Sequence, residues 1–566
     1  MIRSAVFLLA PLLCLGADYS LGPDSQAQEG VPKGKVTQHM LAPGKYFPGT
    51  PHKYSIYVSA QYDPAKPAAF MIFLDGSGAL GNGVRVPVVF DNLIHKRQLP
   101  PMIGIFVDPG MLPAATEKAQ SRFERVFEYD SLSDRYSRFL VEELIPEVGK
   151  SYNLSKDPND RGLYGVSTGA VGAMVAAWHR PDQFRRVLSF IGTFVAMKGG
   201  DGFAALIRRS EAKPIRVFLQ AGKNDHVVPN QPQGTFYAGS WPVNNQVMLD
   251  ALLFAGYDAK LELGEEGHNM KHGAAILPDA LRWLWRGYPE PITVREPAAL
   301  NGPGWDTRGK VSSVVAAGTP WEKVKDGATG PVAGLNGVVY FAAPGGIYKV
   351  ENGAAALFQK TAGAVTALAV GGDGRVYAAE AGRIVSYGPS GEKTLAKMTA
   401  TALAATTKGD IFYVDGAKKR AGKVGGGSVE LDMMTPSGIA LSPDEAMLVV
   451  TDAGGRFAWS YQIGAGGALQ NGEPFFRLEL PETGWTSGVR GAALDSIGQV
   501  YFATALGVQM CEANGRVAAI LHSPEGRVNG LAFGGSNLYL TTEGGLYRRA
   551  VKVQGGVLGA LPRPPL

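Results

Sequence analysis

The sequence predicts a multidomain protein in which an α/β-hydrolase domain is followed by a six-bladed β-propeller. Residues 163–172 have the pattern of an apolar strand, a Gly-x-Ser-x-Gly turn and a helix of small residues. An acid and a histidine come after two later strands, and after residue 321 short apolar strands repeat with glycine turns between them. With 566 residues, the chain is too long for one hydrolase domain. The predicted segments are a signal peptide (1–27), the hydrolase domain (28–290), a linker (291–321), the propeller (322–556) and a tail (557–566).

Ser167 is the candidate nucleophile, at the centre of Gly165-Val166-Ser167-Thr168-Gly169. A sharp strand-to-helix turn lifts a serine hydroxyl clear of the sheet, and glycines on either side relieve the crowding in such a turn. The pentapeptide alone is weak, because a chain with 75 glycines in 566 residues often contains one by chance. The prediction therefore depends on whether an acid and a base occur later in the chain.

The candidate acid and base come after Ser167 in the order expected for an α/β-hydrolase. Residues 215–220 form a strand-like run, and Asp225 lies in the loop after it. Residues 259–263 alternate like a strand, and His268 lies just beyond them. His268 would accept the Ser167 proton, and Asp225 would orient the imidazole and stabilise its cation. The alternative for Asp225 is that it only caps a turn.

Two other histidines compete with His268 for the role of base. His272 lies one helical turn further on and opens the predicted helix that runs to Trp285. We expect His272 to be structural or to face the substrate. His226 is adjacent to the candidate acid, and we expect it to be a loop residue that points away from Asp225.

Backbone amides are the predicted oxyanion donors. The Thr168 N–H opens the helix after the nucleophile, where the first amides have no acceptor within the helix. The second donor should come from an earlier strand end. Residues 70–74 are strand-like, and the N–H of Gly76 or Ser77 lies just after them.

Composition excludes several classes of protein. A net charge of +5, spread over the chain without basic clusters, gives no reason to propose a nucleic acid partner. Cys14 lies in the predicted leader and Cys511 is then unpaired, so we expect no disulfide within the mature chain. We expect no cofactor.

The first 27 residues resemble a secretory signal, with Arg3, an apolar core over residues 5–16 and a polar end at Ala27. Cleavage after Ala27 is the expectation. The core is too short for a stable membrane anchor, and Leu13 is too bulky to precede a lipidated Cys14. We expect an exported protein, in the periplasm or outside the cell.

A repeat occupies the chain after the Pro-rich passage 288–321. Its spacing is mostly about 36 residues, which suits a four-stranded blade, and six such blades close a ring. The repeated strands fall at residues 337–341, 374–378, 409–413, 446–450, 498–502 and 536–540.

Residues 45–290 resemble the α/β-hydrolases that are similar to enterochelin esterases, a group that includes feruloyl and acetylxylan esterases. The matching stretches are Phe73-Leu74-Asp75-Gly76, Phe127-Glu128-Tyr129-Asp130, the Ser167 pentapeptide, Arg180-Pro181-Asp182-Gln183-Phe184, Trp241-Pro242-Val243-Asn244, Gly267-His268-Asn269-Met270-Lys271-His272-Gly273 and residues 277–285. The resemblance implies family roles for Ser167, Asp225 and His268. Thr168 and Ala170 depart from the Ser and Gly usual after the nucleophile, but both are small.

The propeller resembles the gluconolactonase and regucalcin family through residues 435–445 and 528–535. That family holds a divalent metal with Glu, Asn and Asp. Here Thr329, Ser437 and Arg490 stand at the corresponding places. Because a hard cation needs negatively charged oxygen ligands, we expect no metal site and no lactonase activity.

Three functions are compatible with these residues. The first is a secreted serine esterase for carbohydrate-linked or siderophore esters, with acyl transfer as a variant and the propeller as an accessory domain. The second is a metal-dependent lactonase in the propeller, and the third is a non-catalytic binding protein. Glu128, Tyr129 and Asp130 are candidate pocket or scaffold residues, and Trp241 and His272 are further candidates for substrate binding.

Overall fold

The computed structural model describes residues 19–225, 239–294, 310–335, 337–351 and 353–560. The chain divides near Ile292 into two compact units, except that residues 204–213 and 251–257 group with the second unit, and each unit is described by itself. The start of the predicted leader, the middle of the predicted linker and the end of the tail lie outside the described residues. Within the described ranges, no helix is long and apolar enough to cross a membrane.

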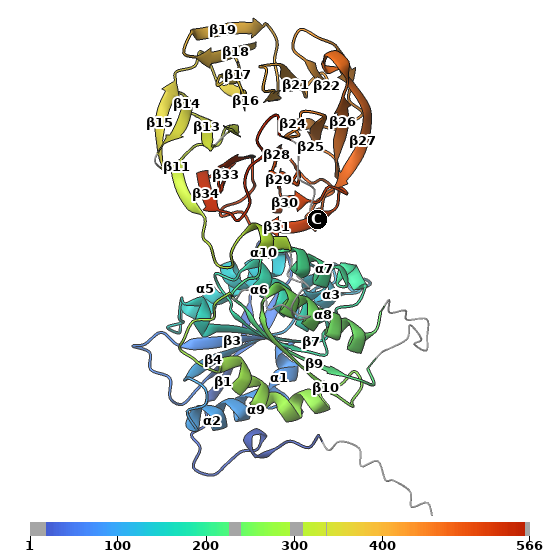
Figure 1. Cartoon of the computed structure of the whole chain (residues 1–566). Coiled ribbons are helices and arrows are strands. Elements are labelled where there is room, and N and C mark those ends of the chain that lie inside the picture. The colour runs from blue at the N-terminus through green and yellow to red at the C-terminus, as the bar shows by residue number, and fades with distance from the viewer. Residues whose placement is uncertain (1–18, 226–238, 295–309, 336, 352, 561–566) are drawn as a thin grey trace, which may run out of the picture. The chain divides into compact units, whose positions relative to one another are not determined.

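The first unit is built on an eight-stranded sheet in the order β1-β2-β4-β3-β7-β8-β9-β10 (Figure 1). The first two pairings are antiparallel and the others are parallel. The strands predicted at 70–74, 215–220 and 259–263 are β3, β9 and β10. Ser167, Asp225 and His268 follow β7, β9 and β10, so the candidate nucleophile, acid and base come after the carboxyl ends of parallel strands, at one edge of the sheet. The bounds are β1 (Lys35–Leu41), β2 (His52–Val58), β3 (Ala69–Leu74), β4 (Met102–Val107), β7 (Arg161–Val166), β8 (Arg186–Phe190), β9 (Arg216–Gly222) and β10 (Asp258–Gly264), with a small hairpin of β5 (Met111–Leu112) and β6 (Arg122–Phe123).

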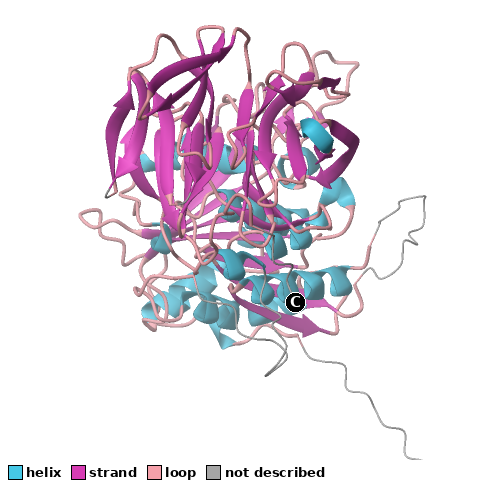
Figure 2. Cartoon of the chain, turned by 45° about the horizontal axis from the view of Figure 1, so that its top comes forward, coloured by secondary structure: helices cyan, strands magenta, loops and turns pink. Residues whose placement is uncertain are grey.

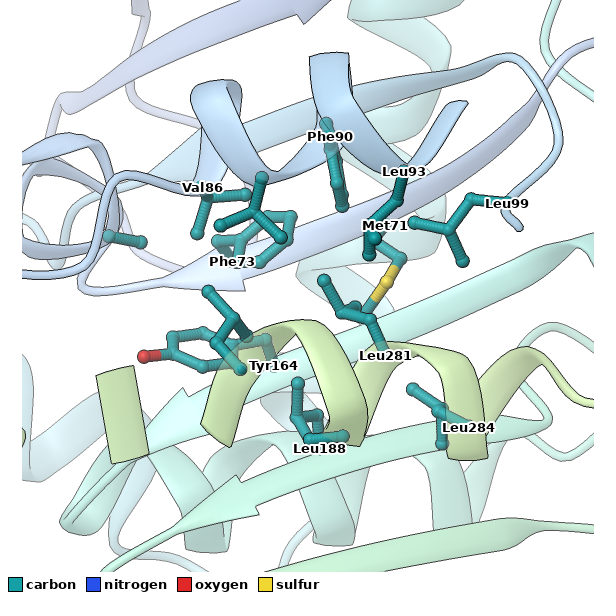
Figure 3. Packing of buried hydrophobic residues seen from close by; sticks show 14 of the residues in the cluster. Met71, Phe73, Val86, Phe90, Leu93, Leu99, Tyr164, Leu188, Leu281 and Leu284 are labelled. Carbon is teal, nitrogen blue, oxygen red and sulfur yellow. The ribbon is translucent and has the colours of Figure 1, made fainter. Parts of the chain in front are cut away.

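Helices cover both faces of this sheet, which explains why the central strands β3 and β4 are apolar without alternation. On one face, α2 and α9 pack on the sheet through a continuous apolar core that includes Phe73, Phe90 and Leu281 (Figure 3). On the other face, α6 packs on β7 and β8 and is covered by α3 and α4. The helices are α1 (Gly76–Leu80), α2 (Val86–His95), α3 (Arg125–Tyr129), α4 (Arg135–Arg138), α5 (Ile145–Gly149), α6 (Thr168–His179), α7 (Gly202–Arg209), α8 (Trp241–Ala255) and α9 (Lys271–Trp285).

The turn between β7 and α6 places Ser167 in a backbone conformation that non-glycine residues rarely adopt. Ser167 has φ +58° and ψ −122°, and its N–H donates to the Phe190 carbonyl of the neighbouring strand at 3.0 Å. A Cβ on Gly165 would lie 1.9 Å from the carbonyl oxygen of Gly169, so only glycine fits there. Gly169 is crowded as well, since its Cβ would lie 2.9 Å from an Asp75 carboxylate oxygen.

An N-terminal arm before Gly30 packs on the first unit. Asp24 pairs with Lys96 and Arg282, and Ser25 is fully buried. The side-chain amide of the buried Asn92 donates to the Asp24 and Gln26 carbonyls at 2.9 and 2.8 Å. Residues on both sides of Ala27 therefore take part in the folded domain, although cleavage after Ala27 was expected from the sequence.

The second unit is a ring of six four-stranded antiparallel sheets, shown in magenta in Figure 2. Strand β11 (Glu322–Asp326) pairs with β34 as the outermost strand of the last blade, so the two ends of the ring close on each other. The other strands, blade by blade, are β12 (Val332–Leu335), β13 (Val338–Ala343), β14 (Gly346–Glu351) and β15 (Ala354–Gln359); β16 (Val365–Val370), β17 (Val376–Glu380), β18 (Arg383–Gly388) and β19 (Gly391–Ala396); β20 (Ala402–Ala405), β21 (Ile411–Asp415), β22 (Arg420–Lys423) and β23 (Ser428–Glu430); β24 (Pro436–Leu441), β25 (Met447–Asp452), β26 (Phe457–Ile463) and β27 (Leu469–Arg477); β28 (Gly491–Leu494), β29 (Val500–Thr504), β30 (Gly507–Cys511) and β31 (Val517–Leu521); and β32 (Gly530–Gly534), β33 (Asn537–Thr542) and β34 (Gly545–Ala550).

The predicted fold class is confirmed in both parts of the chain. Each of the six predicted repeat strands coincides with the second strand of a blade: β13, β17, β21, β25, β29 and β33. These strands lie inside the blade with a neighbouring strand on each side, where β-branched and aromatic side chains pack well. A helix that the repeat did not predict, α10 (Lys310–Val314), precedes β11, and Val314 is buried in the propeller core.

Replacement of Gly165 tests the packing of the β7–α6 turn. The Gly165→Ala variant should lose about 1–3 kcal/mol of unfolding free energy, because its Cβ meets backbone that cannot move away. Gly149→Ala is the matched control, since a Cβ at Gly149 meets open space. Urea unfolding of the two variants measures the difference. Equal stability of the two variants would contradict the tight turn.

Candidate active site

Ser167, His268 and Asp225 form one hydrogen-bonded chain at the carboxyl edge of the parallel strands. The Ser167 Oγ lies 2.9 Å from His268 Nε2. His268 Nδ1 lies 3.0 Å from each carboxylate oxygen of Asp225. The Asp225 side chain is fully buried, whereas the His268 side chain is one quarter exposed. A buried acid, a partly accessible imidazole and a serine on a strained turn can together perform acyl transfer.

The competing histidines occupy other places. His272 lies in the first turn of α9 and is buried, with its Nδ1 3.1 Å from the Gln220 amide nitrogen. Its ring also packs against Tyr19 of the N-terminal arm, and burial lowers its pKa. These contacts connect α9 to β9 and to the arm, so His272 has structural partners. His226 lies outside the described residues.

Trp241 is buried beside the histidine. Its ring meets the His268 ring edge to face, with centroids 5.4 Å apart and an angle of 77° between the planes. Only 2% of Trp241 is exposed. This packing restricts rotation of the imidazole, a role the sequence did not reveal when it suggested Trp241 for substrate binding.

The two candidates for the second oxyanion donor differ in their hydrogen bonds. The Ser77 N–H donates to Asp108 Oδ1 at 2.7 Å, and the Ser77 hydroxyl bonds the other oxygen of the same carboxylate. Because the Ser77 N–H already has an acceptor, the Gly76 N–H is the better candidate for the second oxyanion donor. Thr168 is the first residue of α6, where its N–H has no acceptor within the helix.

An ion pair beneath the turn was missed by sequence reasoning. Arg125 donates from Nε and Nη2 to the two oxygens of Asp75, both at 2.7 Å. Its Nη2 also lies 3.2 Å from the Val166 carbonyl oxygen, one residue before the nucleophile. Asp75 directly precedes Gly76 and has a left-handed backbone, with φ +53°. The bidentate pair therefore joins the oxyanion loop to the nucleophile turn. The signal in the sequence that could have revealed this pair is Asp75, an acid that follows β3 and precedes Gly76.

The three residues of the Glu128-Tyr129-Asp130 segment are all buried, at 2% exposure or less. Glu128 Oε1 accepts from the Gly110 N–H and contacts His52 Nε2, both at 2.9 Å. The Tyr129 hydroxyl accepts from the Asp75 N–H at 3.3 Å. Of the two interpretations that the sequence left open, these contacts favour scaffold over pocket.

Asp130 is the exception within that scaffold, because neither carboxylate oxygen has a hydrogen-bond partner among the described residues. Burial raises its pKa to about 7, although the charges of Lys198 and Arg125 act in the opposite direction.

The propeller residues that stand at the metal-ligand places of gluconolactonases do not fit a divalent cation. The Ser437 hydroxyl donates to the Val489 carbonyl at 2.6 Å, a bond to the next blade, and contacts the Thr451 hydroxyl of its own blade at 2.9 Å. Thr366 makes the equivalent bond to the Ala400 carbonyl at 2.8 Å. Arg490 brings a positive charge instead of a carboxylate. Across the part of the chain that the structure describes, no three His, Cys, Asp or Glu side chains cluster as metal ligands.

Asp130 predicts a specific dependence of stability on pH. Its pKa is raised from an ordinary value of 3.8 to about 7, so the folded state retains a proton that the unfolded state loses. The contribution is favourable below about pH 4, falls as the pH rises toward 7, and is fully lost above that. We expect Asp130→Asn to be about 1–3 kcal/mol more stable than wild type near pH 8 and nearly equal to it near pH 4. Urea unfolding across this range measures it.

The control for that experiment is Asp279→Asn, because the Asp279 side chain is 82% exposed. It should show the wild-type pH dependence. If the wild-type and Asp130→Asn curves ran parallel throughout, the proton would not reside on Asp130.

Comparisons with known proteins match the two parts of the chain to two different families. Residues 48–277 match the family model described as "Putative esterase", and residues 321–544 match that of the "SMP-30/Gluconolactonase/LRE-like region". The chain is 22% identical over 198 residues to the Bacillus subtilis (strain 168) "Uncharacterized protein YbbA", covering 34% of this chain and 73% of that protein. It is 24% identical over 163 residues to the "Iron(III) enterobactin esterase" of Dickeya dadantii (strain 3937), covering 26% of this chain and 34% of that protein.

Solved structures with similarity to this chain fall into the same two groups. The enterobactin esterase of Shigella flexneri gives a TM-score of 0.36 at 19% identity, covering 47% of this chain and 63% of its own. A gluconolactonase of Xanthomonas campestris gives 0.37 at 17% identity, covering 43% of this chain and 92% of its own. The chain therefore joins a region that resembles esterases to a propeller region that resembles gluconolactonases, as the sequence predicted.

Proposed function

We propose that this protein is a serine hydrolase of carboxylic esters that works through an acyl-enzyme. The proposal rests mainly on the hydrogen-bonded chain of Ser167, His268 and Asp225, whose serine lies on a strained strand-to-helix turn. The match of residues 48–277 to the esterase family model supports the same reaction. The strained backbone of Ser167, with φ +58°, is typical of functional sites and supports the same proposal.

The proposed reaction begins when His268 Nε2 accepts the Ser167 proton as Oγ attacks the ester carbonyl carbon. The carbonyl π electrons move to oxygen, and the N–H groups of Thr168 and Gly76 stabilise that oxyanion. The alcohol then leaves with the proton from His268. Water next attacks the acyl-enzyme with His268 as its base, and Ser167 leaves with the returned proton. Asp225 stabilises the imidazolium throughout, since its two oxygens face Nδ1.

The proposed substrates are carbohydrate-linked acetyl or feruloyl esters or siderophore esters, with acyl transfer to a second alcohol as the variant reaction. The relation to an enterobactin esterase supports the siderophore class. The sequence resemblance to feruloyl and acetylxylan esterases supports the carbohydrate class. Hydrolysis of a panel containing both classes decides between them.

The propeller is proposed as an accessory domain rather than a second catalytic centre. Its Ser437 hydroxyl is used to join two blades, and Arg490 replaces a carboxylate. A lactonase that depends on a divalent metal needs oxygen ligands with negative charge, which these residues do not supply.

Hydrolysis of p-nitrophenyl acetate tests the proposed reaction. Ser167→Ala should lower kcat at least about 10⁴-fold, because no other group replaces the nucleophile. Ser121→Ala, in an exposed loop, is the matched control and should retain wild-type activity. Treatment with EDTA should leave the rate unchanged. Activity that survives in Ser167→Ala but is lost with EDTA would move the chemistry to the propeller.

We also propose that the protein is exported and that the leader is cleaved upstream of Tyr19. The ion pairs of Asp24 and the bonds from Asn92 support this position, because cleavage after Ala27 would remove their partners from the folded domain. Tyr19 contributes too, since its hydroxyl accepts from the Glu265 N–H at 2.8 Å.

N-terminal sequencing of the exported protein tests the cleavage point. A mature N-terminus at or before Tyr19 is the expected result, whereas one at Gln28 or an uncleaved chain would contradict the proposal. As a control, a chain that starts at Gln28 should be about 1–3 kcal/mol less stable than one that starts at Tyr19, since it leaves the buried Asn92 amide unpaired.

A further inference from the structure

The loop after β8 brings a second hydroxyl against the candidate nucleophile. Thr193 Oγ1 lies 3.0 Å from Ser167 Oγ. The two backbones are joined as well, because the Thr193 N–H donates to the Ser167 carbonyl at 3.2 Å. Thr193 is 1% exposed, so its hydroxyl must find its partners within the protein.

The direction of this hydroxyl contact follows from the partners at the two ends of the chain. The indole Nε1 lies 3.3 Å from Thr193 Oγ1, and an indole N–H can only donate, so it occupies one lone pair of that oxygen. At the other end the Asp225 carboxylate only accepts, so His268 Nδ1 carries the hydrogen and Nε2 accepts from Ser167. Because the Ser167 hydrogen is used in that bond, the Ser167 oxygen accepts from the Thr193 hydroxyl.

We propose that Thr193 is a positioning residue that donates a hydrogen bond to the Ser167 oxygen, so that Trp241, Thr193, Ser167, His268 and Asp225 form a relay with a single direction. This inference rests on the proposed function and deepens it. Without the indole donor, the Thr193 hydroxyl would lose the bond that orients it toward Ser167.

The start of α8 holds the relay in place. Asn245 Nδ2 donates to the Gly192 carbonyl at 2.8 Å, and Asn244 Nδ2 donates to the Phe194 carbonyl at 2.7 Å. These two bonds clamp the residues on either side of Thr193. Trp241, at the start of the same helix, also packs its ring on His268. One helical turn thus fixes both the base and the hydroxyl beside the nucleophile.

The relay has a chemical consequence during attack. As the Ser167 proton moves to His268 Nε2, negative charge develops on Oγ until its bond to the carbonyl carbon is formed. The hydrogen of the buried Thr193 hydroxyl stabilises that charge. It also restrains the Ser167 side chain to the rotamer that faces His268.

Phosphonylation of Ser167 by a fluorophosphonate tests the relay without knowledge of the natural ester. In this reaction the Ser167 oxygen bonds to phosphorus, fluoride leaves, and His268 takes the proton. The second-order rate constant, read by intact-protein mass spectrometry, should fall roughly 10- to 100-fold in Thr193→Val. Thr193→Ser should restore the rate to within about 3-fold, because it restores the donor.

Ser189→Ala, in the strand β8 that precedes the Thr193 loop, is the matched control. Ser189 is fully buried and its hydroxyl has no hydrogen-bond partner among the described residues, so the loss of its oxygen should not change the rate. Thermal unfolding of every variant reports structural damage separately. A Thr193→Val variant that reacts at the wild-type rate would overturn the relay.

A double-mutant cycle with Trp241→Phe tests the direction of the relay. In the wild-type background this change should slow phosphonylation, because the Thr193 hydroxyl loses the N–H donor that orients it. In the Thr193→Val background it should have little further effect on the rate, since that bond is already absent and Phe keeps an aromatic ring beside His268. Rate losses that multiply independently would contradict the relay. A folded wild type that takes up no fluorophosphonate would instead overturn the proposed function itself.

Discussion

The structure of the first unit depends on the sharp turn that carries Ser167 from β7 into α6. The turn requires that two backbones approach more closely than any side chain allows, and Gly165 provides this beneath the carbonyl of Gly169. The strain at Ser167 is offset by bonds from the neighbouring strand end, where the Phe190 carbonyl accepts the Ser167 N–H. A parallel sheet supplies such partners because its strand ends meet at one edge.

An ion pair and a hydroxyl group pack around the turn between β7 and α6. The Asp75–Arg125 pair ties the oxyanion loop to the carbonyl just before the nucleophile. On the other side, the loop after β8 presents Thr193 and the start of α8 presents Trp241. The turn that carries Ser167 is therefore held by three sets of contacts, from the Asp75–Arg125 pair, from the loop after β8 and from the start of α8, which are far apart in the sequence. Such preorganisation is the main source of rate acceleration in acyl transfer.

The sequence could predict the parts that are encoded locally. The Gly-x-Ser-x-Gly turn, the strands before Asp225 and His268, and the second strand of each blade are all short patterns with a physical cause. It could not predict Thr193, which is 26 residues from Ser167, because only the register of β7 and β8 brings them together. Trp241 was singled out, but its contact with His268 was not, since an aromatic residue carries no local sign of whether it faces a substrate or a histidine. The burial of Asp130 and the packing of the N-terminal arm likewise arise from long-range contacts.

The proposed reaction requires that Ser167 forms a covalent acyl intermediate. Rapid acid quench of the full chain during turnover of p-nitrophenyl acetate, followed by peptide mass spectrometry, detects this intermediate. We expect one acetyl group on the peptide that contains Ser167, accumulating in wild type and absent from Ser167→Ala. An acetyl group on another residue, or turnover in which no acylated peptide can be trapped while p-nitrophenol is released, would contradict it.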